Sequence, residues 1–491
     1  MKVFFPKYDK YADANEGDTL LDVIRVAGLP IEAVCSGRGT CGKCLVNVNG
    51  EEKLACKTPA EDGMIVEVLS SQEKQEILTE HESGDSPAPD SGLAAIAIDV
   101  GTTTVVVKLI DTGSGREIGL RAFANPQRAY GADVLSRINY SMDDASLLSG
   151  LIKDALSKAI FDITGDLSPE KIVIAGNTTM MYLLLGLRCR SLGLVPFEPE
   201  YELRQVYSYK EVFGKEAFSC PVKLYPFVSA FVGGDIVSGL VNIERHQETG
   251  ENPSYMLVDM GTNGEIAYRK GSRLITTSTA AGPALEGGNI TCGMSGLPGA
   301  IYEASYDGEG KFSARTIGGK PAAGICGSGV INLVACLLDA GLISGTGAFT
   351  DEGERVSELT KRFAIDNDIV FTQKDVREFQ LAKGAVRAGI DILIEEIGET
   401  PDMLYLAGGF GQNIDLESAF RVGLIPPELK GKIRVAGNTS LGGCVDACMD
   451  VGRDAPLPML SILAAAEEIN LGSHKKFNDK FMETMMFEGD E

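Results

Sequence analysis

Four cysteines near the N-terminus have the spacing of a metal-cluster loop. They stand in CSGRGTCGKC (35–44) and LACKT (54–58), separated in turn by five, two and eleven residues. Four thiolates are the complement of a [2Fe–2S] cluster, and the small residues between them let the backbone wrap closely around one. Zinc is the alternative, but a zinc site favours two CxxC pairs, and this segment has one. We expect a [2Fe–2S] cluster bound by Cys35, Cys41, Cys44 and Cys56.

Two similar segments further along could bind phosphate. AIDVGTTTVVV (97–107) and LVDMGTNGEIA (257–267) each place an aspartate at a strand end before a glycine turn. Hydroxyl and backbone N–H groups in such a turn can hold phosphate oxygens, and the aspartate can hold Mg²⁺ through water. We expect the two turns to clamp a triphosphate between two lobes. The predicted binding residues are Gly101, Thr102, Thr103, Thr104, Gly261, Thr262, Asn263 and Gly264.

A third segment, LAGGFGQN (406–413), predicts a strand that runs into a Gly-Gly turn and then a helix. Glycines there let a base and ribose approach the backbone. The binding residues that it adds are Gly408, Gly409 and Phe410. FVSAFVGGD (227–235) places Asp235 at the start of a predicted helix, where it either takes part in catalysis or only caps the helix. The candidates for activating water are Asp99, Asp235 and Asp259.

Residues 1–69 are expected to form a small ferredoxin-like β-grasp domain. KVFF and YADANEG predict two short strands, or a strand and a turn, and TLLDVIRVAGL predicts a helix with a Thr19–Asp22 capping box. LVNVNG and MIVEVL alternate as strands do. The polar stretch 70–92 is interpreted as a flexible linker, with an ordered surface loop as the alternative.

From residue 93 to 470, strand patterns alternate with helical ones, which is typical of an α/β fold. A second pair of similar segments, IAGNTTM (174–180) and VAGNTSL (435–441), accompanies the two hairpins in the same order. These pairs predict a duplicated α/β domain with two lobes. Residues 471–491 are expected to form a partly ordered C-terminal tail.

Composition excludes several classes of function. A net charge of −24 argues against binding nucleic acid, whose phosphates require a basic surface. No apolar run is long enough for a membrane helix, and the N-terminus has no signal-peptide pattern, so a cytoplasmic location away from membranes is predicted. The three histidines stand in polar segments, which argues against histidine-centred catalysis. The seven cysteines outside the cluster are expected to be buried structural thiols.

The hairpins and the Gly-Gly turn, in this order, resemble the superfamily of acetate and sugar kinases, Hsp70 and actin, which share a ribonuclease H-like fold. Joined to an iron–sulfur head, nearly the whole chain resembles the reductive activators of corrinoid proteins. The segments that carry the resemblance are CSGRGTCGKC with LACKT, AIDVGTTT, SAFVGGD, LVDMGTNGEI, TAAGPALEG, GICGSGVINL and LAGGFGQN.

This resemblance implies ATP-dependent reduction of an inactive Co(II) corrinoid protein to Co(I). The implied cofactors are a [2Fe–2S] cluster, ATP and Mg²⁺. The implied partners are a corrinoid protein of a methyltransferase system in an anaerobe and an upstream low-potential electron donor. Longer relatives carry an extra domain between the head and the ATPase part, where this chain has only the linker, so a homodimer stays open.

Three alternatives remain. Related ATPases activate other low-potential metalloenzymes, but those generally hold a [4Fe–4S] cluster through cysteines inside the ATPase domain. A redox-gated small-molecule kinase is compatible with the fold, although no sugar or acetate site is identifiable. A redox sensor could bind nucleotide without hydrolysing it.

Overall fold

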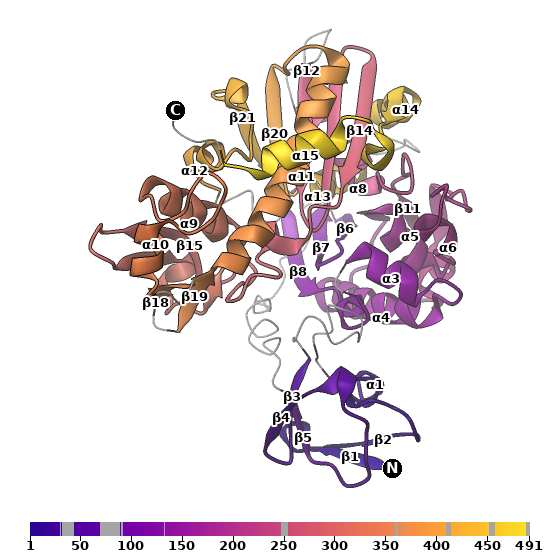
Figure 1. Ribbon diagram of the computed structural model, residues 1–491. Helices are drawn as coiled ribbons and strands as arrows, with labels where there is room; N and C mark the ends of the chain where they lie inside the picture. The colour runs from indigo at the N-terminus through magenta and orange to yellow at the C-terminus, as the bar shows by residue number, and fades with distance from the viewer. Residues whose placement is uncertain are drawn as a thin grey trace. The chain divides into compact units, whose positions relative to one another are not determined.

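The computed structural model describes residues 1–29, 31, 44–68, 89, 92–131, 133–246, 254–358, 362–366, 368–408, 414–450 and 457–487 (Figure 1). The chain divides into two compact units, Met1–Pro226 and Phe227–Glu491. We call residues 1–68 the head, residues 92–226 the first lobe, and the second unit the second lobe. Nearly all of the predicted linker lies outside the described residues. None of the helices within the described ranges has the length and apolar character of a membrane span.

The head is a small β-rich domain with one α-helix among its described residues. Strands β1 and β2 pair antiparallel, and a second sheet has the order β4-β3-β5. The predicted capping box is confirmed, because the Thr19 hydroxyl accepts from the Asp22 N–H and the Asp22 carboxylate accepts from the Thr19 N–H. The elements are β1 (Lys2–Phe5), η1 (Pro6–Tyr8), β2 (Lys10–Asp13), α1 (Leu20–Val26), β3 (Leu45–Val48), β4 (Glu51–Leu54), η2 (Ala55–Lys57) and β5 (Val66–Val68).

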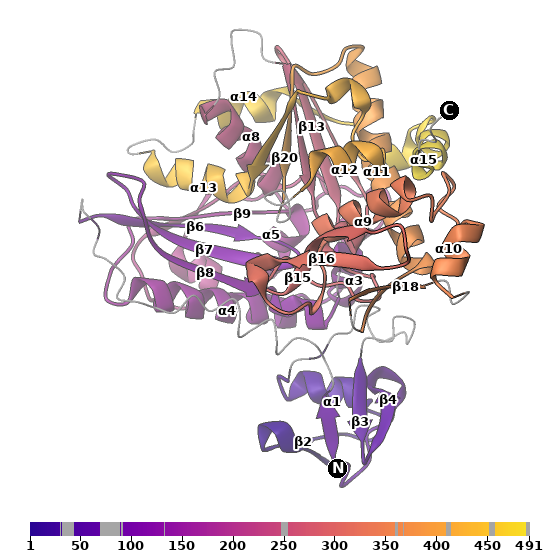
Figure 2. The same ribbon diagram turned by 90° about the vertical axis from the view of Figure 1, so that its left-hand side faces the viewer.

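The first lobe is built on a six-stranded sheet of order β10-β11-β9-β6-β7-β8. Strands β6, β7 and β8 form an antiparallel meander, while β9 runs parallel to β6. Figure 2 shows the long helix α4 running along β7 and β8. The elements are β6 (Ala94–Val100), β7 (Thr104–Asp111), β8 (Glu117–Ala124), η3 (Pro126–Ala129), α3 (Val134–Tyr140), α4 (Ser146–Thr164), β9 (Ile172–Gly176), α5 (Thr178–Leu185), α6 (Arg190–Gly193), β10 (Val206–Ser208), α7 (Tyr209–Phe213) and β11 (Pro221–Leu224).

The second lobe repeats this plan around a sheet of order β21-β20-β12-β13-β14-β22. Strands β12, β13 and β14 form the meander, and β20 runs parallel to β12. Its elements up to α9 are α8 (Gly234–His246), β12 (Ser254–Met260), β13 (Gly264–Lys270), β14 (Arg273–Thr279), η4 (Pro283–Glu286), β15 (Ala300–Tyr306), β16 (Phe312–Thr316), η5 (Ile317–Gly319), β17 (Gly324–Ile325) and α9 (Gly327–Asp339). Those that follow are α10 (Asp351–Val356), β18 (Arg362–Asp366), β19 (Ile369–Thr372), α11 (Gln373–Ile397), β20 (Met403–Ala407), α12 (Leu416–Arg421), η7 (Pro427–Leu429), β21 (Ile433–Gly437), α13 (Thr439–Met449), α14 (Leu457–Ala465), β22 (Ala466–Glu468), η8 (Leu471–Ser473) and α15 (Phe477–Met485).

The predicted duplication is confirmed for the hairpins but not for the second pair of similar segments. IAGNTTM joins β9 to α5, and β9 lies next to the Asp99 strand. VAGNTSL joins β21 to α13, and β21 is one strand further out, because β20 lies between it and β12. The counterpart of β9 is therefore β20. The two segments look alike because each uses an asparagine, Asn177 or Asn438, to cap a helix after a strand.

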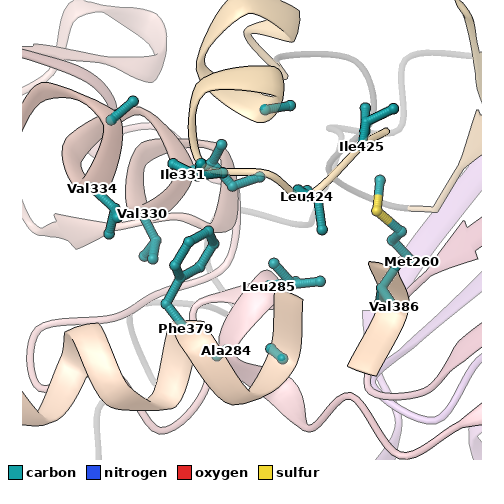
Figure 3. Packing of buried hydrophobic residues seen from close by; sticks show 14 of the residues in the cluster. Met260, Ala284, Leu285, Val330, Ile331, Val334, Phe379, Val386, Leu424 and Ile425 are labelled. Atoms are coloured by element: carbon teal, nitrogen blue, oxygen red, sulfur yellow. The ribbon is translucent and has the colours of Figure 1, made fainter. Parts of the chain in front are cut away.

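The second lobe has a large apolar core that includes the end of the chain. Figure 3 shows part of it, with Ala284 and Leu285 of η4 beside Phe379 of α11. Within the segment expected to form the C-terminal tail, α15 packs along α11, and Phe487 is 3% exposed in the same core. The amide N–H of Phe487 donates to the Gly345 carbonyl at 2.8 Å, which fixes the chain beyond the helix.

Candidate functional site

The head brings two of the four predicted cluster ligands to one end of a hairpin. Cys44 directly precedes β3, and Cys56 lies in η2 directly after β4; Leu45 pairs with Leu54. The Ala55 N–H donates to the Cys44 carbonyl at 2.8 Å, which closes this end. Both thiols are buried. Cys35 and Cys41 lie outside the described residues. Two buried cysteines without a disulfide at one end of the hairpin fit two of the four ligands of the predicted cluster.

The first predicted phosphate turn, residues 101–104, connects β6 to β7. Asp99 is the next-to-last residue of β6, as expected, and is half-buried. The Gly101 N–H donates to the Thr104 carbonyl at 3.1 Å, and a Cβ at position 101 would lie 2.5 Å from that oxygen. Only glycine can therefore close this turn. Thr104 begins β7 and is exposed.

The second predicted phosphate turn is one residue shorter. Met260 pairs with Gly264, so the turn is 261–263, whereas in the first lobe Val100 pairs with Val105. The Gly261 N–H donates to the Asn263 carbonyl at 2.9 Å. The Thr262 hydroxyl donates to a carboxylate oxygen of Glu286 at 2.7 Å. Thr262 is thus tied to an acidic side chain that the sequence analysis did not single out.

The shorter turn changes which residue faces the aspartate. Asp259 lies opposite Glu265, whereas Asp99 lies opposite the apolar Val106. Residues directly opposite in an antiparallel pair share one face of the sheet, so Asp259 and Glu265 are neighbours. Side-by-side comparison of the two segments matches Glu265 with Val105 instead, and for this reason sequence reasoning missed it.

Three carboxyl groups gather at this end of the second lobe. Burial raises the pKa of Glu265 well above its usual value, and the negative charges of Asp235 and Asp259 raise that pKa further. Burial and the two neighbouring carboxylates therefore both favour the neutral form of Glu265. Asp235 is the second residue of α8, in its first turn and not at a cap. Two predicted catalytic residues, Asp235 and Asp259, thus come together, while the third, Asp99, belongs to the first lobe.

The predicted adenosine turn begins directly after β20. Gly408 has φ +106°, and a Cβ there would lie 2.5 Å from the Met260 carbonyl and 3.1 Å from Asp259 Oδ1. A glycine is required so that the backbone at residue 408 can pack against the end of β12. Gly409 and Phe410 lie outside the described residues. Among the described side chains, no group of three or more His, Cys, Asp or Glu residues is arranged to hold a metal ion.

Family models match nearly the whole chain. A 2Fe-2S iron-sulfur cluster binding domain matches residues 9–71, the RACo middle region matches 94–248, and the C-terminal domain of RACo, the ASKHA domain, matches 254–491. The boundary between the last two falls after α8, which packs in the second lobe against α13. The ASKHA model itself thus covers only the second of the two similar sheets.

Named relatives agree with these matches. The corrinoid activation enzyme RamQ of Eubacterium limosum is 29% identical over 613 aligned positions, which cover 99% of each chain. A solved structure described as a reductive activator for corrinoid,iron-sulfur protein is 26% identical, with a TM-score of 0.72 over 99% of this chain and 98% of that one. The chain is a homologue of the reductive activators of corrinoid proteins.

A further activator homologue comes from Methanosarcina barkeri. It is named [Co(II) methylated amine-specific corrinoid protein] reductase and is 27% identical over 423 residues, covering 79% of this chain and 76% of its own length. The alignment with the Eubacterium limosum relative is longer than this chain of 491 residues, so part of that relative has no counterpart here. The predicted combination of a ferredoxin-like head with an actin-like ATPase fold is confirmed.

Proposed function

We propose that this protein is an ATP-dependent reductive activator that returns a Co(II) corrinoid protein to Co(I). The observation that carries the proposal is the end-to-end match with an activator relative, which includes both the 2Fe-2S domain and the ASKHA domain. An electron carrier needs only the first of these domains. The ATPase domain is needed if the reduction is energetically uphill for a ferredoxin-type donor, because ATP can then supply the free energy.

In the head, the chain's task is to hold and shield the cluster. Cys44 and Cys56 would ligate it from the closed end of the β3–β4 hairpin, with Cys35 and Cys41 completing the set. The cluster, when bound, supplies one electron to the cobalt of the substrate protein. Burial of the two described thiols limits their oxidation when the cluster is absent.

In the ATPase part, the two turns have different chemical surroundings. The first, around Thr102 and Thr103, offers hydroxyl and amide groups suited to phosphate. The second offers carboxyl groups, and we propose that Asp259 holds Mg²⁺ through water while Asp235 orients the attacking water. Glu265 lies opposite Asp259, and its raised pKa favours the neutral form, which limits the negative charge at this end of the sheet. ATP promotes reduction only if its binding or hydrolysis differs between two states of the complex.

The finer parts of the proposal are the Mg²⁺ ion, a methyltransferase-system corrinoid protein as substrate, and a separate low-potential donor that reloads the head. They follow from the activator chemistry, because each reduction consumes one electron that another protein must replace. A homodimer is compatible with the chain, but the activity as proposed does not require one.

The test uses anaerobically purified protein with its reduced cluster and a purified Co(II) corrinoid protein from the same organism. We expect the Co(I) absorption band to appear with Mg-ATP and to stay absent without it. Replacing Cys56→Ser should abolish Co(I) formation but spare ATP hydrolysis, while Asp259→Asn should lower both. Cys336→Ala and Asp479→Asn, outside the proposed sites, are the matched controls. Cobalt reduction that is indifferent to ATP contradicts the proposal. Hydrolysis without Co(I) for any corrinoid protein of the organism points to another low-potential enzyme.

A further inference from the structure

The first lobe contains a fully buried arginine whose hydrogen-bond partners among the described residues are all neutral. Arg137 of α3 is 0% exposed. Its Nε donates to the Gly131 carbonyl at 2.9 Å, and its Nη1 lies 3.4 Å from the Gln127 side-chain oxygen. Nη1 also lies 3.2 Å from the Met180 sulfur. Within the described part of the chain, these contacts and one to the phosphate turn account for the guanidinium, and none is to a carboxylate.

This guanidinium carries its charge at neutral pH. Burial, together with the nearby charge of Arg128 and partly offset by Asp133, lowers the pKa of Arg137 to about 9. The group is still protonated near pH 7. A buried cation whose hydrogen-bond partners are all neutral is costly to a fold, and strongly perturbed titratable groups cluster at functional sites.

The remaining contact of Arg137 is to the first phosphate turn. Its Nη2 donates to the Thr102 carbonyl at 2.5 Å. Asn125 holds the carbonyls on either side, because its side-chain amide donates to the Gly101 carbonyl at 2.9 Å and its backbone N–H donates to the Thr103 carbonyl at 2.9 Å. Asn177, the cap of α5, donates to the Thr102 hydroxyl at 3.0 Å. Three successive carbonyls of the turn therefore each accept a hydrogen bond from Asn125 or Arg137.

The orientation of these carbonyls decides which backbone N–H groups of the turn can contact a bound anion. In a trans peptide the N–H points opposite to the C=O, so a carbonyl held by Arg137 turns the N–H of the same peptide group away from it. Successive N–H groups on one side of a turn form an anion-binding concavity. A positive charge directly behind that concavity adds long-range attraction for an anion.

We propose that Arg137 is a positioning residue for phosphate: it fixes the Thr102 carbonyl so that the N–H of the same peptide group faces the phosphate, and its charge, which Asp133 offsets only in part, strengthens the binding of polyphosphate. The ligand class is a nucleoside di- or triphosphate, distinguished from a monophosphate by its charge. The inference deepens the proposed function and rests on it, because it assumes that this turn binds the phosphates of ATP.

The experiment measures the affinity of the full-length protein for AMP, ADP and ATP by titration calorimetry, together with the kinetics of ATP hydrolysis. In R137M we expect ATP affinity to fall about 30-fold or more, ADP affinity about 10-fold and AMP affinity about 2-fold, since the loss scales with ligand charge. R190M is the matched control. Arg190 lies in the same lobe, more than half exposed and paired with Asp143 at 3.1 Å, and its replacement should leave all three affinities unchanged.

A second variant carries the test if R137M does not fold. R137K loses the planar fork but keeps a positive charge at pH 6, where a buried lysine is more fully protonated than at pH 8, so at pH 6 we expect the ATP-to-AMP affinity ratio to stay within about 3-fold of wild type while kcat for hydrolysis falls about 10-fold. If R137M lowers the melting temperature and weakens the binding of AMP, ADP and ATP by the same factor, Arg137 has only a structural role and the proposal is overturned. An unchanged kcat in R137K also overturns it. If the wild-type protein binds neither ADP nor ATP, the proposed function fails first; if the wild type binds both and the Arg137 variants behave like R190M, only this inference fails.

Discussion

Replacing Gly408 by alanine tests whether the turn after β20 controls the end of β12. The two glycines Gly408 and Gly310 share almost the same backbone angle, with φ of +106° and +107°. At Gly310, in the β15–β16 hairpin, an added Cβ meets nothing within 4 Å, whereas at Gly408 it would lie 2.5 Å from the Met260 carbonyl. G310A therefore isolates the backbone cost, and G408A adds the steric conflict.

The magnitudes follow from this difference. A positive φ costs an L-residue about 1–2 kcal/mol, which applies to both variants. An overpacked site typically costs about 1–3 kcal/mol more, because the Met260 backbone must move by several tenths of an ångström. We expect the free energy of unfolding to fall by about 1–2 kcal/mol in G310A and about 2–5 kcal/mol in G408A.

The assay combines urea-induced unfolding, followed by circular dichroism, with steady-state ATP hydrolysis. Moving the Met260 carbonyl also moves Asp259, and a misplacement of about 1 Å at a reacting group can cost about 100-fold in rate. We therefore expect kcat to fall at least about 10-fold in G408A and to stay at the wild-type value in G310A. Equal stability and equal kcat in the two variants would refute the packing argument.

Three further predictions concern stability and thiol reactivity. The pKa of Glu265 in the folded protein lies above its usual value of 4.5, so the protonated carboxyl stabilises the folded state. This contribution is complete below about pH 4.5 and is lost as the pH rises through the raised pKa of the folded protein. E265Q should therefore melt at a higher temperature than wild type at pH 8 but not near pH 4.5, and identical melting at both pH values contradicts this. Truncating the buried Phe487 to alanine should lower the free energy of unfolding by about 3–5 kcal/mol, measured in urea, and a loss below about 1 kcal/mol would show that the chain end is not part of the core. Burial raises the pKa of both Cys189 and Cys220 to about 11, so native protein at pH 8 should leave these thiols unalkylated by iodoacetamide in peptide mass spectra, and their rapid modification would contradict their burial.

Local signals in the sequence predicted the parts of the fold that local chemistry determines. The Thr19–Asp22 capping box marks the start of α1, and Asp99 and Asp259 stand near strand ends as their flanking residues indicate. In each case the deciding contacts lie within a few residues of one another, so the pattern and the structure report the same interaction.

Features that depend on contacts distant in the sequence were not predictable in this way. The length of the second turn is set by the register of the β12–β13 ladder, and that register brings Glu265 opposite Asp259. The inequivalent AGNT segments share a helix cap, which says nothing about the strand order around them. Arg137 reads as an ordinary surface residue in the sequence, because arginine is rarely fully buried. Its contact with Thr102 joins residues 35 positions apart.

The duplicated hairpins have kept one backbone plan and acquired opposite electrostatics. Behind the first turn stands the guanidinium of Arg137, and around the second stand carboxyl groups, including Glu286 bonded to Thr262. Under the proposed function, this divergence assigns the anion to one copy and the cation or polarised water to the other. The copies are then not interchangeable: a chain carrying the first hairpin twice would lack the carboxyl groups proposed to hold Mg²⁺, and one carrying the second twice would place carboxyl groups beside the proposed phosphate site.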